Sequence, residues 1–223
     1  MTDDRATGAV EVAPGEMLRT PQFYLLWTLF FFSALAGLMV IYCIRLFGVD
    51  ALSHQGVADA GLLTGTAMAW YAIFNGLGRI AWGTISDHVG RRNAIISMTA
   101  LQGLVMLAVY HLFISFGSAL GFVVAAACIG FNFGGNFALF PAATADYFGN
   151  KNVGSNYGYV FTAYGLAGIA GPQLASFFRD AASISAGPGI WMTPFLVAGA
   201  VCLLGALLMA LTRSPTTWRA SPV

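Results

Sequence analysis

The chain has 223 residues, of which 58% are hydrophobic and only 9% charged, and its mean hydropathy is +0.75. Soluble domains carry about 25% charged residues, so this composition excludes most cytosolic enzymes and secreted disulfide scaffolds. The net charge of +1 gives no support for a nucleic-acid partner. The composition predicts an integral membrane protein. We expect the three cysteines, which all lie in apolar runs, to be buried and unreactive: Cys43, Cys128 and Cys202.

Residues 1–20 are polar and acidic, and Pro14 and Gly15 are expected to prevent a helix there, so this segment is interpreted as a cytoplasmic linker. Six apolar stretches follow, each long enough to cross a hydrocarbon core of about 30 Å as a helix. They are residues 23–44, 61–82, 94–115, 119–140, 155–178 and 190–212. The sequence thus predicts an all-α membrane protein with six transmembrane helices in one bundle over residues 21–213. Residues 214–223 form a cytoplasmic tail in this prediction.

The basic residues outside these stretches indicate an orientation. An even number of spans places both termini on one side, and a cytoplasmic side is expected to hold most of the Lys and Arg. With both termini in the cytoplasm, only Arg45 and Arg179 lie in loops on the outer side of the membrane. The inner basic residues are then Arg5, Arg19, Arg91, Arg92, Lys151, Arg213 and Arg219. This pattern predicts a multi-pass protein, of a cell inner membrane, with both termini in the cytoplasm and lipid around the bundle.

Glycines recur at four-residue spacing inside the stretches, as in Gly61/Gly65 and Gly130/Gly134. This spacing lets membrane helices approach closely, and static packing is its commonest use. The fifth stretch also contains Gly168, Gly171 and Pro172. Proline removes one backbone hydrogen bond and glycine softens the helix around it, so a bend or hinge is predicted there.

The most specific local pattern is residues 83–92 (GTISDHVGRR), in the predicted loop between the second and third spans. Gly83 would let helices approach, and Gly90 can adopt the positive φ of a tight turn. Asp87 can cap a helix end and pair with Arg91 or Arg92. Taken singly, the two arginines could equally anchor the loop at anionic lipid.

Taken together, this pattern resembles the cytoplasmic-loop motif of the major facilitator superfamily, G-x-x-x-D-x-x-G-R-[RK], in the place where that superfamily carries it. Further segments resemble the C-terminal half of the oxalate–formate antiporter family, over about residues 17–212. They are residues 20–27 (TPQFYLLW), 75–79 (NGLGR), 136–141 (NFALFP), 144–149 (TADYFG), 156–158 (NYG) and 171–172 (GP).

The resemblance implies a six-helix half of a transporter that has twelve helices in two bundles, with substrate at the midplane between them. Only the second bundle is resembled, so the first is expected to be absent from this chain. The implied motion is alternating access by rocking of two bundles. The loop at residues 83–92 would brace the inner-closed state through Asp87, and Gly168, Gly171 and Pro172 would assist as a hinge.

Arg79 is the one charged residue inside a predicted span. It lies about 5 Å from the inner end of its stretch, so it could extend to the interface. The alternative is a ligand site, because Asn75 and Tyr71 lie on the same helix face and no Asp or Glu lies in any span. An uncompensated guanidinium is suited to a carboxylate.

The resemblance supports the second interpretation, because the antiporter family carries a substrate-binding arginine in this helix and Arg79 matches it. In related monocarboxylate porters an aspartate precedes it by one turn, where this chain has Asn75. The oxalate exchanger also uses a lysine in the fifth span. This chain has none there, and Tyr164 is the best match. With one cation instead of two, a monocarboxylate becomes at least as plausible as a dicarboxylate.

Other polar side chains in the spans are Asn132, Asn136, Tyr157 and Tyr164. They are candidates for substrate binding, although hydrogen bonding between helices or packing is the commoner use of such residues. No histidine spacing indicates a metal site, and no cofactor motif is present. An embedded enzyme would need a nucleophile–base or metal cluster at membrane depth, and the sequence has none.

The sequence therefore predicts a secondary transporter, or half of one, for a small organic anion such as oxalate, formate or a monocarboxylate. Exchange is favoured over proton symport, because no embedded carboxylate is present to carry a proton. The alternative is a non-transporting fragment or assembly module that needs a separate N-terminal half or a second copy.

Overall fold

The structure is a computed structural model, and it describes residues 11–116, 119–181 and 191–211. Within them the fold is all-α, with one short helix and six long ones. The helices are α1 (Pro14–Met17), α2 (Pro21–His54), α3 (Ala60–Val89), α4 (Arg91–Phe116), α5 (Ala119–Phe148), α6 (Val153–Ala181) and α7 (Met192–Leu211). Arg5, Arg213, Arg219 and the predicted tail lie outside the described residues, as does the side chain of Arg179.

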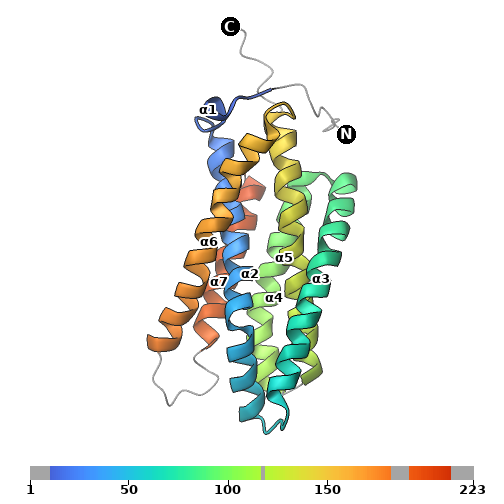
Figure 1. Ribbon diagram of the computed structural model, residues 1–223, viewed down its shortest axis with the longest axis vertical. Coiled ribbons are helices and arrows are strands. Elements are labelled where there is room, and N and C mark those ends of the chain that lie inside the picture. Colours follow the sequence, from blue (N-terminus) through green and yellow to red (C-terminus); the bar gives the residue numbers. More distant parts are fainter. Residues whose placement is uncertain (1–10, 117–118, 182–190, 212–223) are drawn as a thin grey trace.

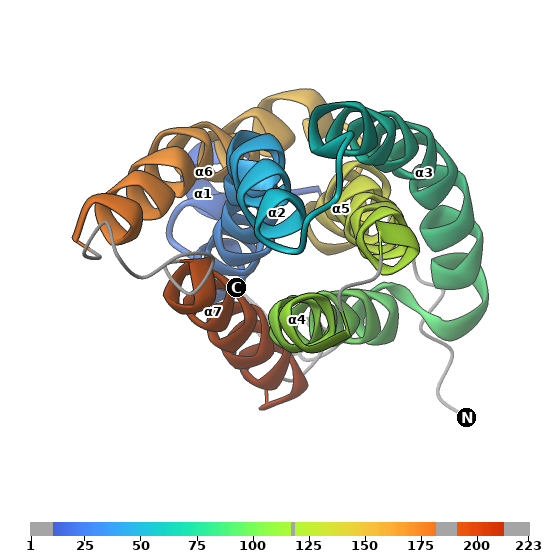
Figure 2. The same ribbon diagram turned by 90° about the horizontal axis from the view of Figure 1, so that it is seen from below.

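The six long helices run alternately up and down, so that α1, the α3–α4 turn and the α5–α6 turn share one end of the bundle (Figure 1). We call this the α1 end. Seen along the bundle, α6, α2 and α3 form one side with α5 behind them, and α7 and α4 form the other side (Figure 2). The most extensive packing joins α3 with α5, α4 with α7 and α2 with α6.

Four of the helices are long and apolar enough to cross a membrane by length and composition: α2, α4, α5 and α7. The other two long helices, α3 and α6, have 30 and 29 residues, but no window within them is apolar enough to qualify. They carry many glycines and polar residues, including Arg79 and Asn75 on α3. The structure therefore shows an all-α chain with several membrane-crossing candidates.

Two predictions about local structure were wrong. The segment with Pro14 and Gly15 forms one helical turn, α1, because proline suits the first position of a helix and Glu16 Oε2 accepts from Ala13 N–H at 3.2 Å. Residues 83–92 are almost entirely helical: α3 continues to Val89, and only Gly90 separates it from α4. Gly90 has the predicted positive φ, at 85°.

The glycine predictions had mixed outcomes. Gly130 and Gly134 each face a backbone carbonyl of α3 closely, as described below, whereas nothing lies within 4 Å of a Cβ added at Gly61 or Gly65. A Cβ on Gly83 would lie 3.7 Å from Ala138 Cβ, which is ordinary contact, so Gly83 is not required for the approach of α3 and α5.

The hinge residues lie within one continuous helix, α6, which contains Pro172 in its interior. Gly171 packs against the backbone of α2, because its added Cβ would lie 3.0 Å from Met39 N and 3.1 Å from Leu35 O. Gly168 has a looser contact, 3.9 Å from Leu38 Cδ1. These contacts fix α6 against α2 at this point, and a hinge there stays a prediction.

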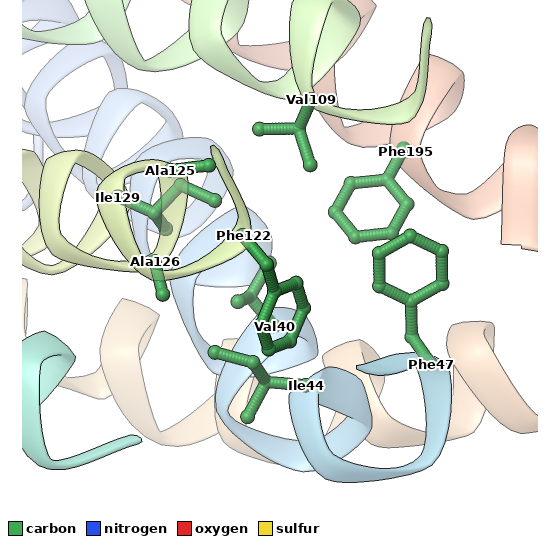
Figure 3. A pocket seen from close by; sticks show the side chains of 9 residues that line it. All are labelled: Val40, Ile44, Phe47, Val109, Phe122, Ala125, Ala126, Ile129 and Phe195. Atoms are coloured by element: carbon green, nitrogen blue, oxygen red, sulfur yellow. The ribbon is translucent and has the colours of Figure 1, made fainter. Parts of the chain in front are cut away.

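One part of the interior away from the α1 end is lined by apolar side chains alone. A small cavity there is lined by nine apolar side chains from α2, α4, α5 and α7, among them Phe47, Phe122 and Phe195 (Figure 3). This cavity contains no polar group that could orient a ligand, so it belongs to the core. Cys43 and Cys202 are buried as predicted, but Cys128 is exposed on α5, which contradicts the prediction for that residue.

Candidate functional site

Arg79 lies on α3, about 15 Å from the helix end at Val89. Its Nε and Nη2 donate to Asn75 Oδ1 at 3.3 and 3.2 Å. Asn75 lies one turn farther from the α1 end, so the guanidinium points away from the interface that a snorkelling side chain would seek. Because α3 extends to Val89, the distance to that interface is also longer than the sequence indicated. The geometry therefore favours the ligand-site interpretation of Arg79.

The guanidinium of Arg79 lies over the ring of Phe137 on α5, with Cζ 4.5 Å from the ring centroid. A cation over an aromatic face is stabilised by about 0.5–1 kcal/mol at exposed sites and by about 2 kcal/mol when desolvated. Phe137 thus provides a flat support that holds the charged group at a fixed place between α3 and α5.

No carboxylate lies within ion-pairing distance of Arg79 in the part of the chain that the structure describes; the ion pairs seen there involve Arg91. Arginine has five N–H donors and always carries its charge. Two of these donors bond to the neutral amide of Asn75. Three N–H groups and the full positive charge therefore remain for another partner, and the side chain is exposed.

An aromatic group continues from Phe137 toward α6 and α2. Phe137 meets Tyr164 edge-on with centroids 5.4 Å apart, and it meets Phe133 at 5.6 Å. Tyr164 stacks on Phe161 at 5.0 Å and lies 6.2 Å from Phe30. The residues of this group come from α2, α5 and α6. Of these residues only Tyr164 is among the predicted site residues; the four-residue spacing of Phe133 and Phe137 is the signal in the sequence that points to the others.

Tyr71 lies beside this group, with its ring 6.3 Å from that of Phe133. It is only 7% exposed, and its hydroxyl has no hydrogen-bond partner among the described residues. A buried hydroxyl without a partner is costly, by about 1–3 kcal/mol. Tyr71 therefore lies one turn from Asn75 and two turns from Arg79 on α3, beside the aromatic group, with a hydroxyl that can accept or donate a further bond.

Glycines set the separation of α3 and α5 at this place. A Cβ added at Gly130 would lie 2.3 Å from Tyr71 O, and one at Gly134 would lie 2.0 Å from Asn75 O. On α3, a Cβ at Gly78 would lie 1.9 Å from Phe131 O. The two backbones are in contact, and this contact places Asn75 and Arg79 against Phe137.

Three other predicted site residues are not directed at Arg79. Asn136 Oδ1 accepts from Ser33 Oγ at 2.7 Å, and Asn132 Oδ1 accepts from Trp82 Nε1 at 3.2 Å. Both asparagines are buried and join helices, which is the alternative use that the sequence left open. Tyr157 is half-buried and lies more than one turn closer to the α1 end than Tyr164 on the same helix. Its ring centroid is 5.5 Å from that of Phe161.

The conformational motif lies at the α1 end. Asp87 Oδ1 pairs with Arg91 Nη1 at 2.7 Å, and Arg91 Nε donates to Asp146 Oδ2 at 3.3 Å. Arg91 Nη1 also donates to Ser86 Oγ. The pairing predicted for Asp87 is confirmed, and Asp146 on α5, which lies in the segment 144–149, is a further partner that was not predicted. We call Asp87, Arg91 and Asp146 the end network, because it ties α3, α4 and α5 together.

Arg92 is directed at α7, where its Nη2 donates to Ala210 O at 2.5 Å. Carbonyl groups in the last turn of a helix have no intrahelical partner, and a cation there is favoured by the helix dipole. Arg91 and Arg92 thus both have protein partners. The structure gives each arginine a role in holding helix ends together besides any contact with lipid.

Four apolar helices long enough to cross a membrane, together with an arginine that has no counter-ion among the described residues, indicate a membrane protein that handles a polar ligand. A family model, the Major Facilitator Superfamily, matches residues 30–223. The chain belongs to that superfamily of integral membrane transporters, and not to a class of enzymes.

The chain is also similar to individual proteins. The chain is 35% identical to the oxalate:formate antiporter of Oxalobacter formigenes, over 82% of this chain and 40% of that protein. It is 31% identical to the uncharacterized MFS-type transporter YhjX of Escherichia coli (strain K12), over 69% and 36%. It is 33% identical to the apicoplast pyruvate carrier 1 of Toxoplasma gondii, over 77% and 28%. The chain thus spans about two fifths or less of the length of these relatives.

Proposed function

We propose that this chain is one six-helix bundle of a secondary transporter for small organic anions, with all six long helices crossing the membrane and the α1 end in the cytoplasm. The observation that carries the proposal is Arg79, an exposed guanidinium with no counter-ion among the described residues, held between Asn75 and Phe137. Two of the relatives reported above are named for the transport of oxalate, formate or pyruvate, all carboxylates.

In this proposal the substrate carboxylate replaces the missing counter-ion of Arg79. The free N–H groups of the guanidinium match a carboxylate in a two-bond arrangement. Tyr71, Asn75 and Tyr164 supply further hydrogen-bonding groups within the same neighbourhood. Asn132, Asn136 and Tyr157 act by packing the helices that carry the site, in accordance with their contacts.

We further propose that the preferred substrate is a monocarboxylate. The rings that continue from Phe137 beneath Arg79 are those of Phe133, Tyr164 and Phe161, and they offer no second cation. A second carboxylate placed against aromatic faces would lose its hydration without gaining a charged partner. A short apolar tail, in contrast, gains from burial against the same rings.

Transport requires that the site open to each side in turn. The end network of Asp87, Arg91 and Asp146 holds α3, α4 and α5 together at the α1 end. In the proposed cycle it braces the state that is closed toward the cytoplasm. Gly90 provides the tight turn, and Arg92 ties α4 to α7. Rocking of this bundle against its counterpart, with bending at Gly168, Gly171 and Pro172, would expose the site.

The test is uptake of labelled oxalate, formate, lactate and pyruvate into proteoliposomes, with wild type, Arg79→Lys and Arg79→Gln. Loss of the fork-shaped guanidinium should abolish uptake in Arg79→Gln and lower it at least tenfold in Arg79→Lys. Arg45→Lys and Arg45→Gln are the matched controls, because Arg45 is an exposed arginine near the other end of α2. Full transport by Arg79→Lys would overturn the bidentate role.

The fraction of each relative that this chain spans supports a second candidate: an assembly module that transports only with a separate N-terminal half or a second copy. Carboxylate binding and transport separate the two cases. An isolated chain that binds pyruvate in an Arg79-dependent way but takes up none is the module. Native mass measurement in detergent would then show whether it is a monomer or a dimer.

A further inference from the structure

Residues 11–20 lie outside the six-helix bundle but are fixed to it, and we call them the strap. The N–H of Val12 donates to Phe148 O at 2.9 Å. The carbonyl of Val12 accepts from Asn156 Nδ2 at 3.1 Å and from Asn152 Nδ2 at 3.3 Å. The N–H of Lys151 donates to Glu11 Oε2 at 2.8 Å. Two strap residues thus make four hydrogen bonds to the α5–α6 turn and the helix ends beside it.

Burial adds to these bonds. Val12 is 6% exposed, Met17 is fully buried in α1, and Asn156 is fully buried beneath the strap. At its other end the strap joins α2, where Thr20 Oγ1 accepts from Phe23 N–H at 3.3 Å and donates to Met17 O at 2.7 Å. The strap is therefore attached at both ends and crosses the α1 end of the bundle beside the α5–α6 turn (Figure 1).

The attachment point lies close to the end network. Phe148 is the last residue of α5, and it follows Asp146 by two residues. The last carbonyl groups of a helix have no partner within the helix, so a terminal turn frays unless another group bonds to it. Val12 supplies that group for Phe148. The turn of α5 that presents Asp146 to Arg91 is consequently held by the strap.

We propose that the strap is a conformational element that keeps the last turn of α5 in place, so that its release loosens the contact of Arg91 with Asp146. The hydrogen bonds that dock the strap are all made between groups of this chain. The significance of the strap for the state that is closed toward the cytoplasm rests on the proposed function. Asn156 is a positioning residue in this scheme, because it acts through the backbone of Val12.

The experiment is hydrogen exchange on the full chain in nanodiscs, followed at the amide of Val12 and in residues 83–94. Asn156→Ala removes one bond to the strap from the bundle side. Val12→Asp places a charge in the buried position from the strap side, outside the six long helices. Ser155→Ala is the matched control, since Ser155 is exposed in the same turn of α6.

Asn156→Ala and Val12→Asp should each raise hydrogen exchange at residue 12 by about tenfold or more, because a buried hydrogen bond and the burial around it are lost. Exchange in residues 83–94 should rise in the same two variants and stay at the wild-type rate in Ser155→Ala. A third variant, Glu11→Ala, should release the amide of Lys151 alone.

The proposal is overturned if Val12 already exchanges at an unprotected rate in the wild type. It is equally overturned if both variants release residue 12 but leave residues 83–94 unchanged, because the strap would then be a passive tether. No substrate enters these measurements. A failure of carboxylate transport at Arg79 would therefore leave the strap result intact, and a failed strap would leave the Arg79 test intact.

Discussion

The backbone contact between α3 and α5 gives the sharpest prediction, Gly134→Ala. The added methyl group would lie 2.0 Å from Asn75 O, a backbone atom, whereas real Cβ contacts are essentially never shorter than 3.0 Å. The two helices must therefore separate by about 1 Å at this point, because a backbone carbonyl cannot rotate away as a side chain can. Overpacking of this kind costs about 1–3 kcal/mol.

The same displacement changes the site, because Arg79 is hydrogen-bonded to Asn75 on α3 and lies over Phe137 on α5. A misplacement of about 1 Å in a positioned site can cost about 100-fold in activity. We therefore expect Gly134→Ala to lower the thermal midpoint in detergent by several degrees. It should lower carboxylate uptake far more than that loss of stability explains.

The matched control is Gly83→Ala, on the same pair of helices. Its methyl group would lie 3.7 Å from Ala138 Cβ, in ordinary contact, and alanine favours a helix over glycine by up to about 1 kcal/mol. The thermal midpoint of this variant should equal or exceed that of wild type. If Gly134→Ala and Gly83→Ala behave alike in both unfolding and uptake, the inference that glycine contact sets the site is refuted.

Three further predictions concern single contacts. Phe137→Leu keeps an apolar side chain but removes the ring under Arg79, and should weaken pyruvate binding about 2- to 30-fold, the equivalent of about 0.5–2 kcal/mol; titration calorimetry that shows unchanged affinity would contradict it. Ser33→Ala leaves buried Asn136 Oδ1 without its donor and should destabilise the fold by about 1–3 kcal/mol, measured by thermal unfolding. Asp87→Asn should slow transport with little effect on the thermal midpoint, because the Asp87 side chain is 61% exposed and such pairs contribute about 0–1 kcal/mol; reduced stability with normal transport would argue against a gating role.

Much of the fold can be predicted from the long stretches of sequence that lack charged residues. Five of the six apolar stretches fall within long helices, and α7 (Met192–Leu211) lies inside the sixth stretch, 190–212, because an apolar run of this length has no better way to satisfy its backbone. The helix ends were misplaced, since polar residues continue the helices beyond the apolar runs. The extension of α3 to Val89 is the clearest case: hydropathy marks the limit of apolar residues, whereas the helix ends where Gly90 reverses the chain.

The site was only partly predictable from sequence. Charge and spacing make Arg79 and Asn75 candidates, because a cation in an apolar run is conspicuous. Phe137 could not be chosen among the 18 phenylalanines, because its role depends on the approach of α3 to α5. The contact of Asn136 Oδ1 with Ser33 was likewise hidden from the sequence, because it joins two helices; Asn136 Nδ2 is buried without a partner among the described residues, so a ligand role for Asn136 stays a prediction.

The pair α3 and α5 links the site to the end network. On α3, Arg79 and Asp87 are eight residues apart, or about 12 Å along the axis. On α5, Phe137 and Asp146 are nine residues apart, or about 13 Å. Each helix thus contributes one partner to the arginine–ring contact and one carboxylate to the network around Arg91. Because the glycine contacts hold the two backbones together, neither helix can slide past the other. In the proposed cycle, a motion that breaks the end network would therefore carry the Arg79–Phe137 contact with it as a rigid unit, so that the arginine would stay in place for the proposed ligand.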